Sequence, residues 1–140
     1  MTKIVRTFEV AGPPENVFGL LSDPEKWPRW APFVRQASRI GPKTHWIYDM
    51  GGMKVEADTE VTESSENRVY AFHQTGGFLA SGTTRFDIEP TQQGSKVTWT
   101  AEYELPYSYL GKLVDKLRGR KQFEEAIDES IKGLKSRVER

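Results

Sequence analysis

Apolar and polar residues alternate along the chain from about residue 34 to residue 105. Because successive side chains of a strand point to opposite faces, this period of two predicts strands that are buried on one side and solvated on the other. The clearest stretches are 53–62 and 96–105. Their predicted inward residues are Met53, Val55, Ala57, Thr59 and Val61 in the first, and Val97, Trp99, Ala101, Tyr103 and Leu105 in the second, with Phe86 and Ile88 in the strand between them.

Turn-forming residues separate these stretches. Gly51-Gly52 suits a two-residue hairpin, and we expect longer turns at Glu66-Asn67, Gly76-Gly77 and Gln92-Gln93-Gly94. Short turns between alternating strands predict an antiparallel meander of six strands with one apolar face. A further strand is predicted at residues 3–10, although Arg6 interrupts its apolar side.

Two short helices are predicted after that first strand. Pro14 is placed to begin one that ends near Leu21. Asp23-Pro24-Glu25 has the composition of a second helix start, with an N-cap residue followed by proline and an acidic residue. Prolines 28 and 32 limit this second helix to a turn or two, and leave Trp27, Trp30 and Phe33 in a compact aromatic corner.

The C-terminal part of the chain is predicted to be one long amphipathic helix. Its apolar residues are spaced for a single helix face, with a gap at 118–121; they are Leu110, Leu113, Val114, Leu117, Phe123, Ile127, Ile131, Leu134 and Val138. This face supplies the cover that the apolar side of the sheet needs. We therefore predict an α+β fold in which a curved seven-stranded antiparallel sheet surrounds the helix, as one domain spanning residues 1–140.

Composition narrows the classes of function. The 140 residues carry 20 Lys and Arg against 20 Asp and Glu, a net charge of zero, which argues against a broadly basic nucleic-acid-binding surface. There is no Cys, and the two His residues cannot form a three-His zinc site, so we expect neither metal nor cofactor. Neither a signal-like N-terminus nor an apolar run of about 20 residues is present, and we expect a cytoplasmic protein.

The order of these elements resembles the helix-grip fold of the START-like (SRPBCC) superfamily, which includes polyketide cyclase/dehydrase and lipid-transport proteins. The resemblance covers essentially the whole chain. The segments that carry it are Phe8-Glu9-Val10, Pro14-Glu15-Asn16-Val17-Phe18, the stretch Asp23-Pro24-Glu25-Lys26-Trp27-Pro28-Arg29-Trp30, the hairpin end Gly94-Ser95-Lys96-Val97-Thr98-Trp99 and the tail from Leu110. These are structural motifs, so the resemblance implies the fold and leaves the activity open.

A curved sheet cannot follow a straight helix closely along its length, and a cavity between them is the first candidate site. The alternative is that the same side chains fill a solid core. The small inward residues Ala57, Thr59, Gly82 and Ala101 favour open space. The residues that we predict to bind a ligand there are Trp27, Trp30, Trp46, Tyr48, Met53, Val55, Ala57, Phe72, Phe86, Trp99, Tyr103, Leu117, Phe123 and Ile127.

Acid–base chemistry has little support in the sequence. His45 precedes Trp46 and His73 follows Phe72, and we predict that the aromatic member of each pair faces inward and the histidine outward. The carboxylates Glu56, Asp58 and Glu60 share the polar side of their strand, as a solvated surface requires. With no nucleophile elbow and no phosphate-binding loop, we predict no catalytic residue; an enzyme here would act by orienting a reactive substrate.

Basic residues gather where the long helix is predicted to begin: Lys112, Lys116, Arg118, Arg120 and Lys121. They suit peripheral contact with an anionic membrane surface. The simpler interpretation, which we favour, is a solvated helix face in which Arg120 and Lys121 pair with Glu124 and Glu125.

Together these features predict a monomer or homodimer that binds a hydrophobic small molecule, such as a lipid, polyketide or quinone-like compound. Two alternatives stay open. One is a cyclase or dehydratase, an aromatase/cyclase-type enzyme that uses the same pocket. The other is a chaperone-activator-like module that binds a protein partner through its sheet or its Trp27–Phe33 corner.

Overall fold

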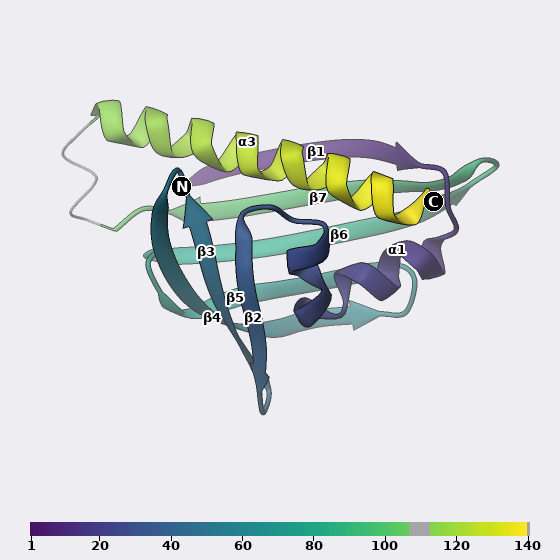
Figure 1. Ribbon diagram of the computed structural model, residues 1–140, viewed down its shortest axis with the longest axis horizontal. Helices are drawn as coiled ribbons and strands as arrows, with labels where there is room; N and C mark the ends of the chain where they lie inside the picture. Colours follow the sequence, from purple (N-terminus) through teal and green to yellow (C-terminus); the bar gives the residue numbers. More distant parts are fainter. Residues whose placement is uncertain (107–112, 140) are drawn as a thin grey trace.

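A curved antiparallel sheet of seven strands is the framework of the protein (Figure 1). The computed structural model describes the backbone of residues 1–106 and 113–139, and the side chains of residues 1–106 and 119–139. The strands are β1 (Thr2–Val10), β2 (Val34–Ile40), β3 (Lys43–Met50), β4 (Met53–Ser65), β5 (Val69–Gly77), β6 (Ser81–Thr91) and β7 (Gly94–Glu104). Their order in the sheet is β1-β7-β6-β5-β4-β3-β2, so the six-strand meander is confirmed and β1 joins its last strand.

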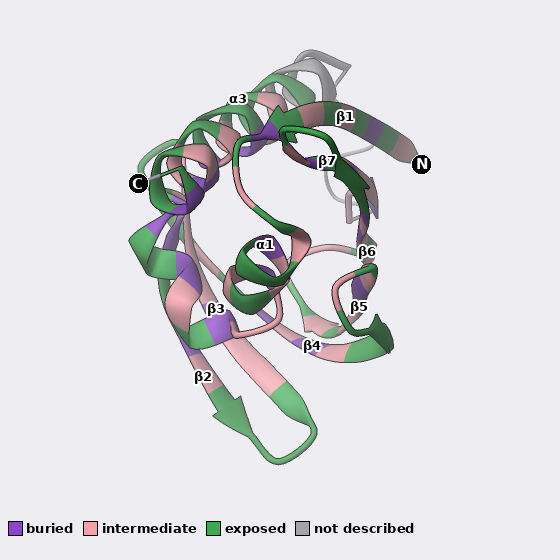
Figure 2. Cartoon of the chain, turned by 90° about the vertical axis from the view of Figure 1, so that its right-hand side faces the viewer, coloured by how far each residue is buried: buried purple, intermediate pink, exposed green. Residues whose placement is uncertain are grey.

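In the described part of the chain, three helices lie on the concave side of the sheet. They are α1 (Pro14–Leu21), the 3₁₀-helix η1 (Pro24–Arg29) and α3 (Leu113–Val138). Seen end-on, the sheet curves around α1, and α3 runs along the gap between β1 and β3 (Figure 2). The predicted helix-grip arrangement is therefore confirmed, while the predicted helix start near Leu110 lies outside the described residues.

The two short helices begin as their sequences require. Pro14 is the first residue of α1, where a missing N–H costs no hydrogen bond. The side chain of Asp23 caps η1 by accepting a hydrogen bond from the backbone N–H of Glu25 at 3.3 Å.

The hairpin turn between β3 and β4 is the one that the glycines predict. Gly51 and Gly52 have φ values of 64° and 86°, a pair of positive angles that two successive glycines adopt without strain. The turn predicted at Gly76-Gly77 was wrong, because both residues belong to the end of β5. Gly77 instead permits close approach of β4, since a Cβ there would lie 2.6 Å from the Cα of Ala57.

Burial along β4 departs from simple alternation. Ala57 and Thr59 are buried as predicted, but Met53 is 59% exposed and Val61 is 49% exposed. Met53 directly follows the hairpin turn at the free end of the β3–β4 pair. Val61 pairs with Phe72 in unbroken register from Thr59, so it stays on the predicted face of β4, but it lies there in a shallow surface pocket with Pro24 and Tyr70.

The core is an aromatic cluster centred on Trp27. Its ring centroid lies 4.5 Å from that of Trp30, 5.0 Å from Trp46 and 5.8 Å from Phe86. The indole N–H of Trp27 donates to the carbonyl of Leu21 at 2.9 Å, which satisfies its polar group inside the core. The predicted aromatic corner therefore reaches inward and joins η1 to the sheet.

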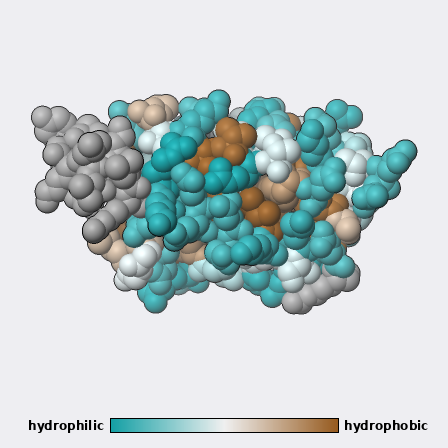
Figure 3. Space-filling view, turned by 90° about the horizontal axis from the view of Figure 1, so that it is seen from above, coloured by the Kyte–Doolittle hydropathy of each residue, from teal (hydrophilic) through white to brown (hydrophobic). Residues whose placement is uncertain are grey.

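Arg6, which interrupts the apolar pattern of β1, contacts the long helix. Its guanidinium donates to Asp128 at 2.9 Å and to Glu124 at 3.2 Å. The hydrogen bond to Asp128, and to a smaller extent that to Glu124, raises the pKa of Arg6. Seen from above, the face that carries α3 is largely hydrophilic, with small hydrophobic areas between the polar groups (Figure 3).

A glycine in α3 sets how closely this helix approaches the core. A Cβ at Gly133 would collide with the backbone carbonyl of Trp30. By contrast, a Cβ at Gly19 of α1 would meet nothing within 4 Å. The two helical glycines therefore differ in role: Gly133 is needed for packing, and Gly19 is not.

We predict opposite effects of alanine at these two positions. Gly133→Ala should lower the free energy of unfolding by about 2–3 kcal/mol, because α3 must move away from Trp30. Gly19→Ala should raise it by about 0.5–1 kcal/mol, because alanine favours the helix more than glycine does. Urea denaturation of both variants checks this, and equal effects of the two substitutions would contradict the packing described.

Candidate functional site

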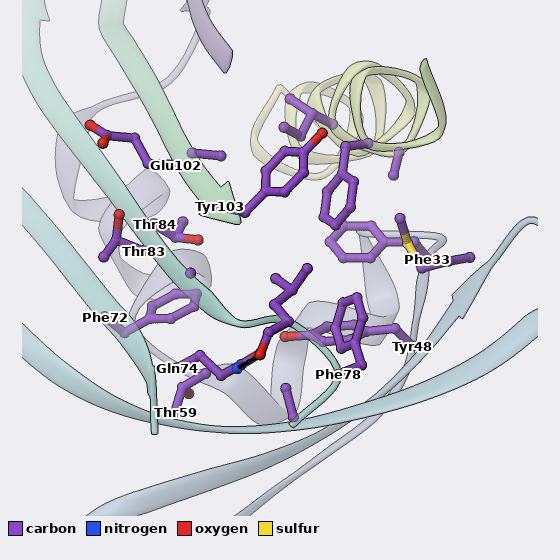
Figure 4. Close-up of a pocket in the computed structure, with 18 of the residues that line it drawn as sticks. Phe33, Tyr48, Thr59, Phe72, Gln74, Phe78, Thr83, Thr84, Glu102 and Tyr103 are labelled. Atoms are coloured by element: carbon purple, nitrogen blue, oxygen red, sulfur yellow. Dashed lines mark hydrogen bonds between the residues drawn. The ribbon is translucent and has the colours of Figure 1, made fainter. Parts of the chain in front are cut away.

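A pocket of about 100 Å³ lies between the concave face of the sheet and α3 (Figure 4). It is formed by residues from η1, from the segment between η1 and β2, from strands β3 to β7, from the β5–β6 loop and from α3. The lining residues are Trp27, Phe33, Tyr48, Met50, Ala57, Thr59, Phe72, Gln74, Phe78, Leu79, Gly82, Thr83, Thr84, Trp99, Ala101, Glu102, Tyr103, Phe123, Ala126 and Ile127.

The structure brings part of the predicted site together. The predicted residues that line the pocket are Trp27, Tyr48, Ala57, Phe72, Trp99, Tyr103, Phe123 and Ile127. The small residues Thr59, Gly82 and Ala101, which favoured open space, line it too. The side chain of Leu117 lies outside the described residues.

Other predicted site residues lie elsewhere. Trp30, Trp46 and Phe86 are buried in the solid core behind the pocket. Trp46 is held there because its indole N–H donates to the Thr59 hydroxyl at 2.7 Å. Val55 is half-buried and Met53 is exposed at the hairpin end, and neither lines the pocket.

Sequence reasoning missed several lining residues. Phe78 and Leu79 lie in the loop after β5, where a period of two predicts nothing about side-chain direction. Phe33 and Met50 stand at the boundaries of β2 and β3. Gln74 lies one residue beyond His73, on the same side of β5 as Phe72, and this alternation was a signal that could have found it.

Aromatic rings form the wall next to α3. The rings of Tyr103 and Phe123 are stacked with centroids 4.1 Å apart and planes at 20°. Phe78 continues this group, 6.5 Å from Phe123 and nearly parallel to it at 8°. Tyr48 lies 6.1 Å from Phe78, and Phe33 stacks on Tyr48 at 5.5 Å, so the series of rings continues. Such a surface suits flat apolar groups.

A few polar groups interrupt this apolar wall. Gln74 donates from Nε2 to the carbonyl of Leu79 at 2.8 Å. Its Oε1 and the indole N–H of Trp99 are buried and have no hydrogen-bond partner within the described part of the chain. Burial raises the pKa of Tyr48 and of Tyr103, so both phenols stay protonated.

The charged side chain that lines the pocket lies at its edge. Among the described residues that line it, Glu102 is the one charged side chain. Its Oε1 lies 4.0 Å from Nζ of Lys3, and the side chain is 39% exposed. Nor does any group of three His, Asp or Glu side chains within residues 1–106 and 119–139 come close enough to hold a metal ion.

The histidines lie away from the pocket. The ring of His45 lies between two carboxylates, with Nδ1 2.7 Å from Asp58 and Nε2 3.2 Å from Glu56. Hydrogen bonds to Asp58 and then to Glu56 raise the pKa of His45. The prediction that His45 faces outward is confirmed, and His73 likewise does not line the pocket.

The basic cluster near the start of α3 is described only in part. Arg120 pairs with Glu124 at 2.8 Å, as helical spacing predicts. The side chains of Lys112, Lys116 and Arg118 lie outside the described residues. Within the helices that the structure describes, none is long and apolar enough to cross a membrane.

Comparison with known proteins agrees with this fold. A family model described as "Polyketide cyclase / dehydrase and lipid transport" matches residues 1–139. The chain belongs to this family, which places it in the START-like class. Membership supports binding of a hydrophobic ligand or a cyclase role, without choosing between them.

Individual relatives are distant. An uncharacterized protein of Mycobacterium tuberculosis is 26% identical over 110 residues; the match covers 71% of this chain and 64% of that protein's length. A solved structure from Thermus thermophilus has a TM-score of 0.83 at 26% identity, with 98% of this chain and 97% of that one covered.

Two further solved structures share the fold. A START superfamily protein from Mycobacterium smegmatis has a TM-score of 0.81 at 22% identity, with 98% of this chain and 97% of that one covered. The di-domain ARO/CYC StfQ from the steffimycin biosynthetic pathway has a TM-score of 0.75 at 17% identity; 98% of this chain matches 50% of that chain.

The ion pairs of His45 should make the free energy of unfolding depend on pH. Because its pKa is higher in the folded protein than in the unfolded chain, the pairs stabilise fully below about pH 6.5 and lose this contribution as pH rises through the folded pKa. His45→Gln should therefore cost less than about 1 kcal/mol at pH 6, as expected for exposed pairs, and less still at pH 9.

Urea denaturation of both proteins between pH 6 and pH 9 measures this difference. Asp58→Asn in the His45→Gln background should then have no additional pH-dependent effect. A difference between His45→Gln and the parent that grows with pH would contradict the assignment.

Proposed function

We propose that the protein binds a hydrophobic small molecule in the pocket between the sheet and α3. The observation that carries this proposal is a pocket whose wall is aromatic and apolar, with isolated polar groups and its single described charge at the edge. Sites of this composition suit ligands that are mostly apolar and are oriented by a few hydrogen bonds. The description of the family, which names lipid transport, agrees with this role.

The residues that we propose as ligand contacts are those predicted from the sequence that line the pocket. Ala101 and Thr59 join them, because their small side chains leave the space that a ligand would occupy. Trp30, Trp46 and Phe86 support the wall from behind and are proposed to act through packing alone.

A second candidate is a cyclase or dehydratase reaction in the same pocket. The hydroxyl of Tyr48 points into the space (Figure 4), where a neutral phenol can hydrogen-bond to a carbonyl of a bound substrate. An enzyme of this kind would accelerate the reaction by holding the substrate in one orientation. Turnover of a polyketide-like substrate that Tyr48→Phe abolishes would favour this candidate.

Binding itself is tested with neutral aromatic compounds of increasing size. Toluene, naphthalene and anthracene are each titrated while the tryptophan fluorescence is recorded, because Trp27 and Trp99 line the pocket. We predict saturable binding of at least one compound with Kd between about 10 μM and 1 mM, equivalent to about 4–7 kcal/mol. The same protein, freshly purified, is examined by native mass spectrometry for a retained ligand.

Ala101→Phe should fill the pocket and weaken this binding at least tenfold, at a cost of about 1–3 kcal/mol in stability. The matched control is Thr100→Phe, one residue earlier on the opposite face of β7, next to Val5 and Arg85. The control should bind as the parent does. Equal binding by the parent and Ala101→Phe, or no binding of any compound, would contradict the proposal.

A further inference from the structure

The size of the pocket restricts what it can hold. Its volume of about 100 Å³ is well below the roughly 300–1,000 Å³ of pockets that enclose drug-sized ligands. It is closer to the cavity of about 150 Å³ that accommodates a single benzene ring in a protein core. Loop residues contribute to its wall, but Ala57, which lies against Gly77 of the next strand, and Tyr103, which stacks on Phe123 of α3, belong to regular elements. A compact ligand therefore fits without displacing the sheet or the helix.

One side of the pocket offers an unused hydrogen-bond acceptor. Because Nε2 of Gln74 donates to the carbonyl of Leu79 at 2.8 Å, the orientation of the amide is fixed and its free atom is the oxygen. This Oε1 is buried without a partner among the described residues. A buried acceptor without a partner costs about 1–3 kcal/mol, and a ligand that donates a hydrogen bond to it would remove this penalty.

The hydroxyl of Tyr48 lies on the same side of the pocket. It points toward the side on which Gln74 lies (Figure 4), and its ring is held by stacking on Phe33 and Trp46. The pKa of Tyr48 is raised by burial, so its O–H remains available to donate. Gln74 and Tyr48 both line the pocket, one as a hydrogen-bond acceptor and the other as a donor.

No described side chain that lines the pocket would balance a negative charge on the ligand. The lining residue Glu102 is itself an anion, and its partner Lys3 does not line the pocket. An ion that entered this apolar space would lose its hydration without gaining a partner. Anionic compounds of the same size are therefore disfavoured.

We propose that the ligand is a compact, uncharged, single-ring compound with one hydroxyl group, which donates to Oε1 of Gln74 and accepts from the hydroxyl of Tyr48. This inference rests on the proposed binding function and names the chemical class of the ligand. A single hydroxyl supplies both hydrogen bonds, and the ring occupies the aromatic part of the pocket between Tyr103 and Phe33.

The test compares four probes by calorimetry at pH 7: phenol, toluene, benzoate and 2-naphthol. Phenol and toluene have nearly the same size and differ in the hydroxyl, benzoate adds a negative charge, and 2-naphthol adds a second ring. We expect phenol to bind at least fivefold more tightly than each of the other three. This order is informative because toluene is the more hydrophobic of the first pair and would bind better to a wall without polar groups.

Two variants test whether Tyr48 and Gln74 cause the preference for phenol. Tyr48→Phe and Gln74→Leu should each reduce the preference for phenol over toluene to twofold or less and leave toluene affinity within twofold of the parent. The matched control is Tyr70→Phe, which removes a hydroxyl from a buried tyrosine that does not line this pocket. Tyr48→Phe removes a hydroxyl group that has no described hydrogen-bond partner, so this variant should fold as the parent does. Its phenol preference therefore decides the test even if Gln74→Leu does not fold.

The outcomes separate this inference from the proposed function. Toluene, benzoate or 2-naphthol binding as tightly as phenol overturns the ligand class and leaves the binding function intact. A phenol preference that survives in Tyr48→Phe overturns the assigned contacts. No binding of any of the four, nor of the larger neutral compounds above, overturns the binding function itself.

Discussion

The position of Trp27 is the constraint on which the rest of the molecule depends. This one indole, on a 3₁₀-helix of six residues, lies between the two arms of the curved sheet. It contacts Trp46 from one arm and Phe86 and Trp99 from the other. Because its ring is rigid, Trp27 links the two arms at a fixed separation. The hydrogen bond from Trp27 to Leu21 fixes the indole and joins α1 to the same unit.

Trp27 also divides the concave face into a solid part and a hollow part. On one side lie large rings, and Trp30, Trp46 and Phe86 are buried there. On the other side Ala57, Gly82 and Ala101 face α3, and their small side chains leave the pocket. Unfilled space lowers stability, so a protein keeps a cavity at a cost in its own packing energy. The cavity and the core are thus made by the same sheet, with residue size deciding which of them forms.

Much of this architecture could be read from the sequence, because periodicity reports which face of an element is apolar. It predicted the strands, the position of α1 and η1, the long helix and the inward direction of Trp46 beside an outward His45. It could not tell a pocket wall from solid core, since Trp46 and Tyr48 share one face and differ only in what lies opposite them. Nor could periodicity report where the cover of a face ends, as at the exposed Val61, or where a loop places its side chains, as with Phe78 and Leu79 in the pocket.

The pairing of β1 with β7 has a consequence for how the chain folds. Residues 2–10 pair with residues 95–103, so β1 must wait until almost the whole sheet has been synthesised before it can pair. At about 5–20 residues per second this interval lasts several seconds, during which Ile4 and Val10 have no cover. Contacts so distant in sequence also slow folding, because a long loop must close before any pairing energy is gained. Among the strands of this sheet, β1 therefore waits longest for its partner, since each of the others pairs with a neighbour in sequence.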